Sequence, residues 1–215
     1  ASAAHKKLEE AVQPAEGKPS ILLSIVSYRD FQCAETIKSA LSRASHPERI
    51  IVSVVDQIAP GVDPGCAPFC DTTVARLADV RCRHIDRIHV YRMDARNATG
   101  PILARHVAAR MYRGEAFVLQ IDAHNEFVVG WDEDILAQWR ATSNEYAVLS
   151  TYLTDLQGSI DSAGHSLRKT RAIMCNSDFK EGNGEPVQYM RHGAQPEEVA
   201  VIQGTPMLQP FWGAG

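Results

Sequence analysis

Two short apolar runs, at residues 21–26 and 50–55, constrain the fold of this chain more than any other feature of its sequence. Bounded runs rich in Ile, Leu and Val are typical of strands that are buried on both faces, as in a parallel sheet. Between them, residues 35–44 place apolar side chains at helical spacing. A strand, a helix and a second strand in this order predict two parallel strands joined by a crossover helix.

The same alternation continues to about residue 151. Further strands are expected at residues 89–93, 117–121 and 146–151, and further helices at residues 101–112 and 131–140. Residues 58–72, rich in Pro, Gly, Asp and Cys, form a long loop of the kind that often carries function. This pattern predicts an α/β protein with an open, mostly parallel sheet that is flanked by helices.

The two ends of the chain carry weaker signals. After residue 152 only short strands are expected, at residues 171–175 and 199–202, with a polar, Gly-rich loop at residues 177–186. Residues 1–19 are polar with little apolar periodicity, which predicts a loosely attached helix or tail. We therefore expect this tail followed by one domain at residues 20–215.

Charge and hydropathy exclude several classes of partner. The formal net charge of -4 and the pI of about 6.1 give no electrostatic reason to expect nucleic-acid binding. No window approaches the roughly 18 to 20 uninterrupted apolar residues of a membrane span, and residues 1–17 lack the apolar core of a signal peptide. We expect no nucleic-acid partner, no membrane span and a cytoplasmic protein. The lumen of the secretory pathway is the alternative if a signal has been removed.

The five cysteines form no obvious disulfide framework. They are an odd number, and they are scattered except for Cys66 and Cys70. A zinc clip would need a second closely spaced pair, for which Cys82 with His84 is the nearby candidate. A local disulfide or free thiols is the expectation that we prefer.

Polar side chains follow four of the expected strands. They are Ser27 to Asp30, Asp56 with Gln57, Asp94 to Arg96, and Asp122 to His124. In open α/β sheets, ligands bind outside the carboxyl ends of the strands, near the point where the strand order reverses. These strand ends therefore predict a ligand site of carboxylates, arginines and a histidine along one edge of the sheet.

Asp122 and His124 are the best candidates for metal ligands. Residues two apart on an extended backbone point to the same side, so both side chains can reach one ion. A carboxylate oxygen with an imidazole nitrogen suits Mn²⁺ or a similar borderline divalent ion better than Ca²⁺. We expect Mn²⁺, with Mg²⁺ as the alternative. The alternative is that Asp122 caps the following turn and His124 is a polar loop residue. The hydrophobic strand directly before the pair favours the metal site.

Arginines are concentrated between residues 81 and 113. This segment holds eight of them in a chain of net negative charge. Arginine forks suit the oxygens of a diphosphate, although most of these side chains are expected to be solvated. Arg96 and Arg105 are the two candidates that we retain for phosphate binding.

Taken together, several of these segments resemble known glycosyltransferases. Residues 98–105, 117–124 and 129–131 resemble the core of the polypeptide N-acetylgalactosaminyltransferases, in which a Gly-Leu-Ile-x-x-Arg helix leads into a strand ending Leu-Asp-x-His. A closer resemblance is to the family that adds N-acetylglucosamine to hydroxyproline of Skp1-type proteins. It is carried by Ser24–Asp30, Thr36–Ile37, Val54–Gln57, Asp94–Arg96, Gly100–Pro101, Ala104–His106, Gln120–Asp122 and Gln209–Trp212. The resemblance covers about residues 20–215.

The resemblance implies a GT-A-type fold and an N-acetylglucosaminyltransferase-like enzyme. It would use a UDP-sugar donor and a divalent metal, and it would modify a protein or glycan hydroxyl with retention of the anomeric configuration. Carried over residue by residue, Asp122 and His124 would bind the metal, with Arg105 and Arg96 on the donor side. The residues implied around the donor are Ser27, Tyr28, Arg29 and Asp56 beside the nucleoside, Gly100 at a close backbone approach, and Trp212 with Gly213 at the sugar and acceptor pocket.

Two other functions stay open at the level of the sequence. Relatives continue beyond Gly215 with a further metal-ligating histidine and acidic acceptor-site residues, so a truncated or degenerate relative is one alternative. It would bind a nucleotide or a partner protein without turnover. The second alternative is an unrelated α/β protein for phosphate-bearing metabolites, in which Asp122 and His124 are structural. Metal-dependent UDP binding would exclude this second alternative.

Overall fold

A computed structural model describes residues 17–68, 70, 78–151, 153, 156–168, 177–182 and 185–192. Its elements are β1 (Ile21–Tyr28), α2 (Cys33–Arg43), η1 (Pro47–Arg49), β2 (Ile50–Ile58), α4 (Val80–Arg83), η2 (Ile85–Arg87), β3 (Ile88–Asp94), η3 (Ala95–Asn97), α5 (Pro101–Ala109), β4 (Phe117–Asp122), α6 (Trp131–Ala141), β5 (Ser177–Gly182) and β6 (Glu185–His192). The chain divides into two compact units, Ala1–Asp134 and Ile135–Gly215, which are described separately.

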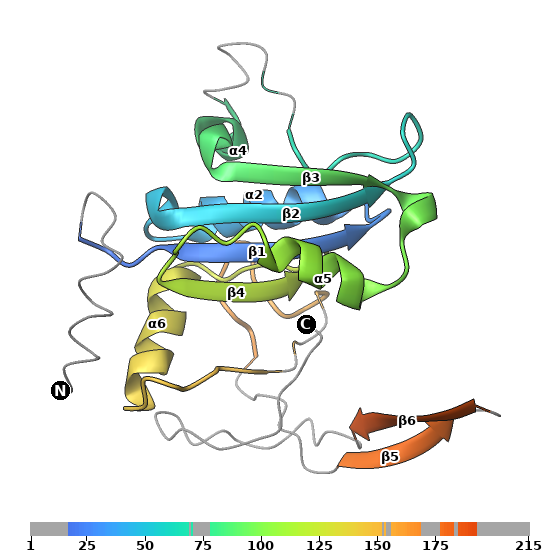
Figure 1. Ribbon diagram of the computed structural model, residues 1–215. Helices are drawn as coiled ribbons and strands as arrows, with labels where there is room; N and C mark the ends of the chain where they lie inside the picture. The colour runs from blue at the N-terminus through green and yellow to red at the C-terminus, as the bar shows by residue number, and fades with distance from the viewer. Residues whose placement is uncertain are drawn as a thin grey trace. The chain divides into compact units, whose positions relative to one another are not determined.

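The first unit is built on a four-stranded parallel sheet. Its strand order is β3-β2-β1-β4, and every neighbouring pair is parallel. The chain runs outward from β1 through β2 to β3 and then returns to the other side of β1, where it forms β4 (Figure 1). The predicted α/β fold with an open parallel sheet is therefore confirmed. The reversal of strand order lies between β1 and β4, which is where such sheets bind ligands.

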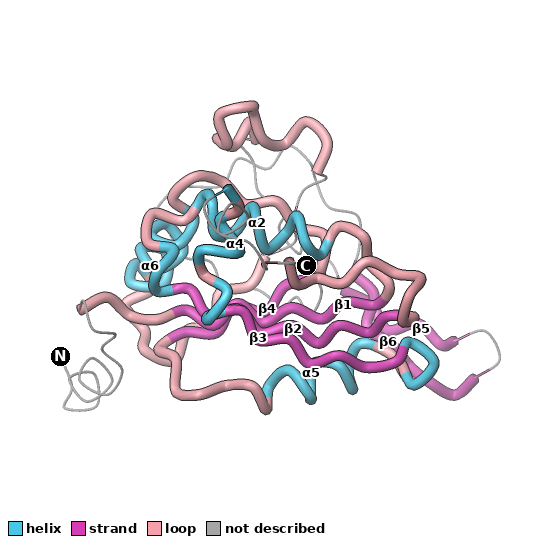
Figure 2. Tube along the Cα trace, turned by 90° about the horizontal axis from the view of Figure 1, so that it is seen from above, coloured by secondary structure: helices cyan, strands magenta, loops and turns pink. Residues whose placement is uncertain are grey.

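Helices lie on both faces of this sheet. Helices α2 and α4 lie on one face and contact each other, whereas α5 packs on β1 and β2 from the other face (Figure 2). Successive right-handed crossovers change faces when the direction of winding along the sheet reverses. At the edge of the sheet where β1 and β4 meet, the face covered by α5 and the face covered by α2 therefore present different side chains.

The core of this unit is apolar on both faces of the two central strands. Most side chains of β1 and β2 are buried, as the uninterrupted Ile, Leu and Val runs predict. On the α5 face, Ala104 and Ala108 pack against Val55. Because these alanines are small, the helix backbone lies close to the sheet. The polar residues at the start of α5 are thereby held beside the strand ends.

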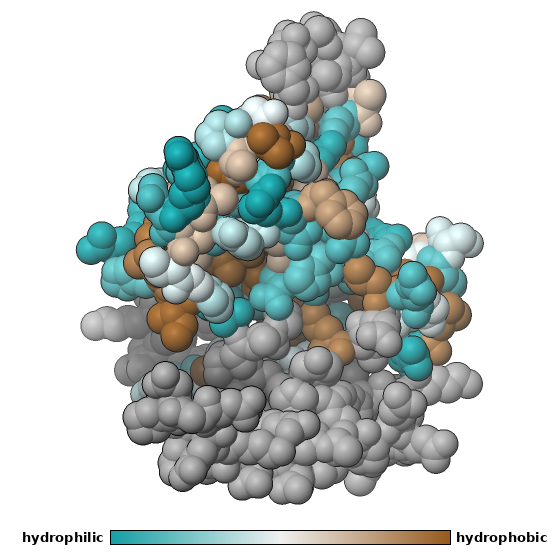
Figure 3. Space-filling view, turned by 90° about the vertical axis from the view of Figure 1, so that its right-hand side faces the viewer, coloured by the Kyte–Doolittle hydropathy of each residue, from teal (hydrophilic) through white to brown (hydrophobic). Residues whose placement is uncertain are grey.

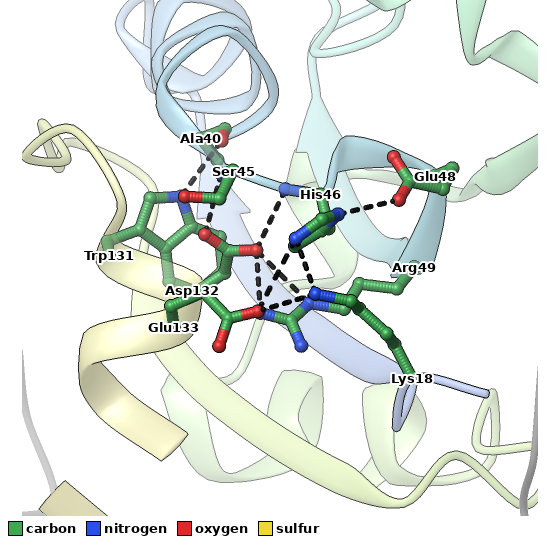
Figure 4. Close-up of polar contacts among 9 residues, drawn as sticks. All are labelled: Lys18, Ala40, Ser45, His46, Glu48, Arg49, Trp131, Asp132 and Glu133. Atoms are coloured by element: carbon green, nitrogen blue, oxygen red, sulfur yellow. Dashed lines mark hydrogen bonds and ion pairs between the residues drawn. The ribbon is translucent and has the colours of Figure 1, made fainter. Parts of the chain in front are cut away.

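A buried ion pair fixes the opposite end of the sheet. Arg49, just before β2, donates to the carboxylate of Asp132 in the first turn of α6 at 2.7 and 3.1 Å (Figure 4). The same carboxylate accepts the backbone N–H groups of Ser45 and His46. Burial acts to raise the pKa of Asp132, but these hydrogen bonds and the charge of Arg49 outweigh it and hold the pKa below its usual value. Asp132 therefore stays ionised and ties the entry of β2 to α6.

Two disulfides correct the expectation for the cysteines. Cys33 at the start of α2 is bonded to Cys66 in the loop after β2, and Cys70 is bonded to Cys82. The first bond spans 33 residues and the second spans 12, and the closely spaced Cys66 and Cys70 are not bonded to each other. Sequence spacing does not predict this first bond, because the fold of β1, α2 and β2 brings the two cysteines together.

The second unit departs from the sequence prediction at two places. Residues 146–151 form no strand, and Val148 is 75% exposed. The polar segment at 177–186, which predicts a loop, instead contributes β5 and the start of β6, paired antiparallel. The strands expected at 171–175 and 199–202 lie outside the described residues. Of the helices in the described ranges, none has the length and apolar character to cross a bilayer.

Candidate functional site

A cleft of about 390 Å³ opens at the carboxyl edge of the sheet, at the reversal of strand order. Figure 3 views the molecule from this edge, where hydrophilic side chains lie beside apolar ones. The cleft is lined by Val26, Tyr28, Asp30, Gln57, Ala98, Gly100, Pro101, Asp122, Ala123 and His124. These residues come from the ends of β1, β2 and β4 and from the start of α5. The strand-end prediction of a ligand site is thus matched by a cleft in the expected place.

Strand register decides which side chains face this cleft. Tyr28 pairs with Gln57, and Val26 pairs with both Val55 and Asp122. Residues in register share a face and residues two apart share it too, so Tyr28, Gln57 and Asp122 point to the α5 side of the sheet. Their neighbours along the strands point to the α2 side. On each strand, the side chains that line the cleft are therefore those that point to the α5 side of the sheet.

Asp122 faces an arginine of α5. Nη2 of Arg105 donates to Oδ1 of Asp122 at 3.2 Å. The Nε of Arg105 is buried and donates to no acceptor among the described residues. One edge of the guanidinium thus holds the carboxylate, while a second donor is left for another acceptor. An anion beside Asp122 would find this donor in place.

His124 faces a carboxylate of the loop after β1. Its Nδ1 lies 2.7 Å from Oδ2 of Asp30. Because an ionised carboxylate only accepts, Nδ1 carries the proton and Nε2 is left for another partner. Oδ1 of Asp30 accepts the backbone N–H of Gln32 at the start of α2, which fixes the carboxylate. Asp30 therefore sets both the tautomer and the direction of the His124 ring.

The turn that carries His124 is itself tied to α2. The hydroxyl of Thr36, which is buried, donates to the carbonyl oxygen of Ala123 at 2.7 Å and accepts the N–H of Asn125 at 2.9 Å. The side-chain amide of Asn125 donates to the carbonyl oxygen of Asp122. These bonds hold the backbone on both sides of His124. The Asp-Ala-His segment is thus a rigid part of the cleft.

Asp56 and Ser27 lie on the other face of the sheet. Asp56 is fully buried and accepts the N–H of Cys66 at 2.9 Å, and Ser27 is 1% exposed. Burial raises the pKa of Asp56, while the N–H of Cys66 and the charge of Arg92 act in the opposite direction. Neither residue lines the cleft. Their predicted contact with a nucleoside stays a prediction, and the disulfide-bonded loop covers Asp56 in this structure.

The other two predicted donor arginines pair with nearby carboxylates. Arg29 donates to Asp63 at 2.8 and 3.1 Å, and Arg96, with 88% of its side chain exposed, pairs with Asp94 at 2.6 Å. The hydrogen bond from Arg96 lowers the pKa of Asp94 to about 2. Both arginines lie outside the cleft lining, so they are not brought together with Asp122 and His124 here.

The remaining predicted residues are divided between the cleft and the undescribed segment. Gly100 lines the cleft with φ of 105°, a backbone conformation that residues with a Cβ rarely adopt. It precedes Pro101, which starts α5. Trp212 and Gly213 lie outside the described residues. Tyr28, Gly100, Asp122 and His124 are therefore the predicted site residues that line the cleft, and Arg105 contacts Asp122 without being part of that lining.

Asp122 and His124 fit part of a metal shell. They offer a carboxylate and an imidazole to one cleft, and Asp30 orients the imidazole as carboxylates commonly do for metal-binding histidines. Within the described ranges, no cluster of three or more His, Cys, Asp or Glu side chains is arranged to hold a metal. The pair alone would leave the remaining coordination positions to ligand oxygens and water.

Asp30 and Gln57 are functional candidates that the sequence interpretation did not select. Both stand at strand ends that the sequence marks as polar, and both line the cleft. The signal that could have identified them is the two-residue period from Tyr28 to Asp30 and the pairing of Tyr28 with Gln57.

Comparison with known proteins gives one match. A family model described as "Glycosyltransferase (GlcNAc)" matches residues 20–77 and 66–215, which is most of the chain. No curated protein matches the sequence.

Proposed function

The chain belongs to the glycosyltransferase (GlcNAc) family, and from this premise we propose that it is a metal-dependent, retaining transferase of GT-A type. It would transfer N-acetylglucosamine or a related sugar from a UDP-sugar to a hydroxyl group. The acceptor would be a protein, with a hydroxyproline-type residue, or a glycan. The observation that carries this proposal is the placement of Asp122 and His124 in one cleft at the switch point of the sheet.

The residues around the pair support binding of a diphosphate. Asp122 and His124 would hold Mn²⁺ or Mg²⁺, which when bound would act as a Lewis acid on the leaving diphosphate. Arg105 lies beside Asp122 and has a buried Nε donor that no described residue uses. A phosphate oxygen would satisfy that donor, and its positive charge would stabilise the negative charge that grows on the departing UDP.

The carboxylates of the cleft favour a reaction without an enzyme nucleophile. Asp30 and Asp122, the two carboxylates that line the described cleft, are each committed to a partner, His124 or Arg105. In the proposed step the bond from the anomeric carbon to the phosphate oxygen breaks, and UDP leaves with the electron pair. The acceptor oxygen bonds to the same face of that carbon, and its proton passes to the departing phosphate. Such a front-face attack retains the configuration.

The disulfides bear on the compartment. The sequence allows a cytoplasmic protein or one in the lumen of the secretory pathway. Disulfides form and persist in oxidising compartments and are rare in the cytosol. With Cys33 bonded to Cys66 and Cys70 to Cys82, we favour the lumen for this chain.

Calorimetric titration of UDP into the chain, with Mn²⁺ and then with chelator, tests the proposal. We expect binding that requires the metal. Binding that is unchanged by chelator would remove the metal from the proposal, and absence of binding to the chain and to a longer form of the protein would remove the nucleotide site. If UDP binds, a donor-hydrolysis and transfer assay separates an enzyme from a relative that binds without turnover.

A further inference from the structure

Gln57 carries a buried acceptor that the described protein does not use. The residue stands near the end of β2, is 3% exposed and lines the cleft. Its Nε2 donates to the carbonyl oxygen of Ser27 at 3.1 Å. Its Oε1 is shielded from water and accepts no hydrogen bond from any described residue. Native proteins retain few such unpaired acceptors, so this one calls for a partner from outside.

The orientation of this amide is fixed by its neighbour. A carbonyl oxygen can only accept a hydrogen bond, so the nitrogen of the Gln57 amide must face Ser27. A flipped amide would place two oxygens against each other. Oε1 is therefore held as an acceptor and cannot exchange places with the donor.

Tyr28 supplies an aromatic surface beside this acceptor. It is the register partner of Gln57, it lines the same cleft, and it is 58% exposed. Exposed aromatic rings bind nucleobases by stacking, and this contact tolerates any base because every base has a π-face. Selectivity must then come from a polar group at the edge of the base. Among the described residues that line the cleft, Gln57 has a buried polar side-chain atom without a partner.

We propose that Gln57 reads the nucleobase of the donor by accepting the hydrogen bond of its imide N–H. This inference rests on the proposed function, in which the donor is a UDP-sugar. Uracil presents N3–H as a donor between its two carbonyl groups, whereas the N3 atom of cytosine can only accept. A buried acceptor at this edge therefore selects uracil over cytosine, and Tyr28 stacks on it.

Calorimetric titration of the Mn²⁺-loaded chain with UDP and with N3-methyl-UDP tests this inference, because the methyl group removes the N3–H. The variant is Gln57→Met, which keeps the side-chain length and lacks the acceptor. We expect the unmodified chain to prefer UDP over the methylated ligand by about tenfold or more, the size of one hydrogen bond in a closed site. Gln57→Met should bind UDP more weakly and distinguish the two ligands by less than about threefold.

Two further variants keep the result interpretable. Gln120→Met makes the same replacement on strand β4 at the edge of the sheet, at an exposed residue outside the cleft lining, and should keep the preference of the unmodified chain. Gln57→Asn keeps an amide, but its side chain is one carbon shorter, so it should also lose the preference for UDP over N3-methyl-UDP. It therefore tests the inference even if Gln57→Met has a lowered Tm. If the folded Gln57 variants prefer UDP as strongly as the unmodified chain does, the inference is wrong while the proposed function stands. If UDP binds neither the unmodified chain nor a longer form of the protein, both are wrong.

Discussion

Removing the carboxylate of Asp132 should destabilise the fold without touching the cleft. This carboxylate is fully buried and accepts four hydrogen bonds, from the N–H groups of Ser45 and His46 and from two nitrogens of Arg49. In Asp132→Ala the Arg49 guanidinium, 3% exposed, keeps Glu133 at 3.1 Å as its remaining carboxylate partner. Breaking a buried ion pair costs roughly 3 to 5 kcal/mol. Because Glu133 offsets part of this, we expect a loss of about 3 kcal/mol.

Urea and thermal unfolding measure this loss. For a chain of this size each kcal/mol lowers Tm by about 2 to 4 °C, so Asp132→Ala should melt about 6 to 12 °C below the unmodified protein. The matched control is Glu35→Ala, which removes the exposed ion pair with Lys38. Exposed pairs contribute at most about 1 kcal/mol, so this control should change Tm little. Equal, small shifts in both variants would refute the importance of the buried pair.

The ion pair of Arg49 and Asp132 also predicts how the free energy of unfolding changes at acidic pH. The folded pKa of Asp132 lies below its usual value, so its ionisation stabilises the fold above the unfolded pKa of about 4. That stability is lost as the pH falls from there through the lower folded pKa. The difference in unfolding free energy between the unmodified chain and Asp132→Ala should therefore be full at neutral pH and shrink below about pH 4. A difference independent of pH would show that the charge of Asp132 is not the cause.

The remaining predictions concern the cleft. Asp122→Asn and His124→Ala should each weaken Mn²⁺-dependent UDP binding by at least about tenfold in calorimetry, and unchanged affinity in both would remove the metal assignment. Asp30→Asn should lower Mn²⁺ affinity by about tenfold, because the carboxylate that orients His124 loses its charge; equal affinity would leave Asp30 as a cap of α2. Arg105→Ala should weaken UDP binding by about 1.5 to 3 kcal/mol, whereas a change in Tm alone would make this arginine structural.

The parallel sheet was predictable because burial on both faces leaves a strong pattern. The Ile, Leu and Val runs at 21–26 and 50–55 became the two central strands with small changes at their ends. Residues 146–151 have the composition of a strand, but the described structure assigns no strand to them. Strands β5 and β6 show the converse, because the segment at 177–186 is mostly polar and the pairing of the two strands is not visible in its periodicity.

The sequence predicted that the candidate site lies at the strand ends, but it did not predict every side chain that lines the cleft. Asp122 and His124 were selected from the two-residue spacing, and both line the cleft. The resemblance selected Asp56 and not Gln57, and a shift of one residue moves a side chain to the other face of the sheet. That choice depends on the pairing of β2 with β1, and the structure places Gln57 in the cleft. The partner of Cys33 was hidden for a similar reason, because contact across 33 residues is a property of the fold.

The buried ion pair of Arg49 with Asp132 and the cleft residue Gln57 lie at opposite ends of strand β2. Arg49 and Asp132 lie at its entry and Gln57 near its exit, and the eight residue steps from Arg49 to Gln57 span about 26 Å along the strand. Substitutions this far apart with no shared partners are close to additive in free energy. If the proposed donor site is correct, substitutions at the cleft end of the sheet could therefore alter the choice of donor, while the entry end supplies the stability that tolerates such change. A lineage of these enzymes could diversify its substrates without rebuilding its framework.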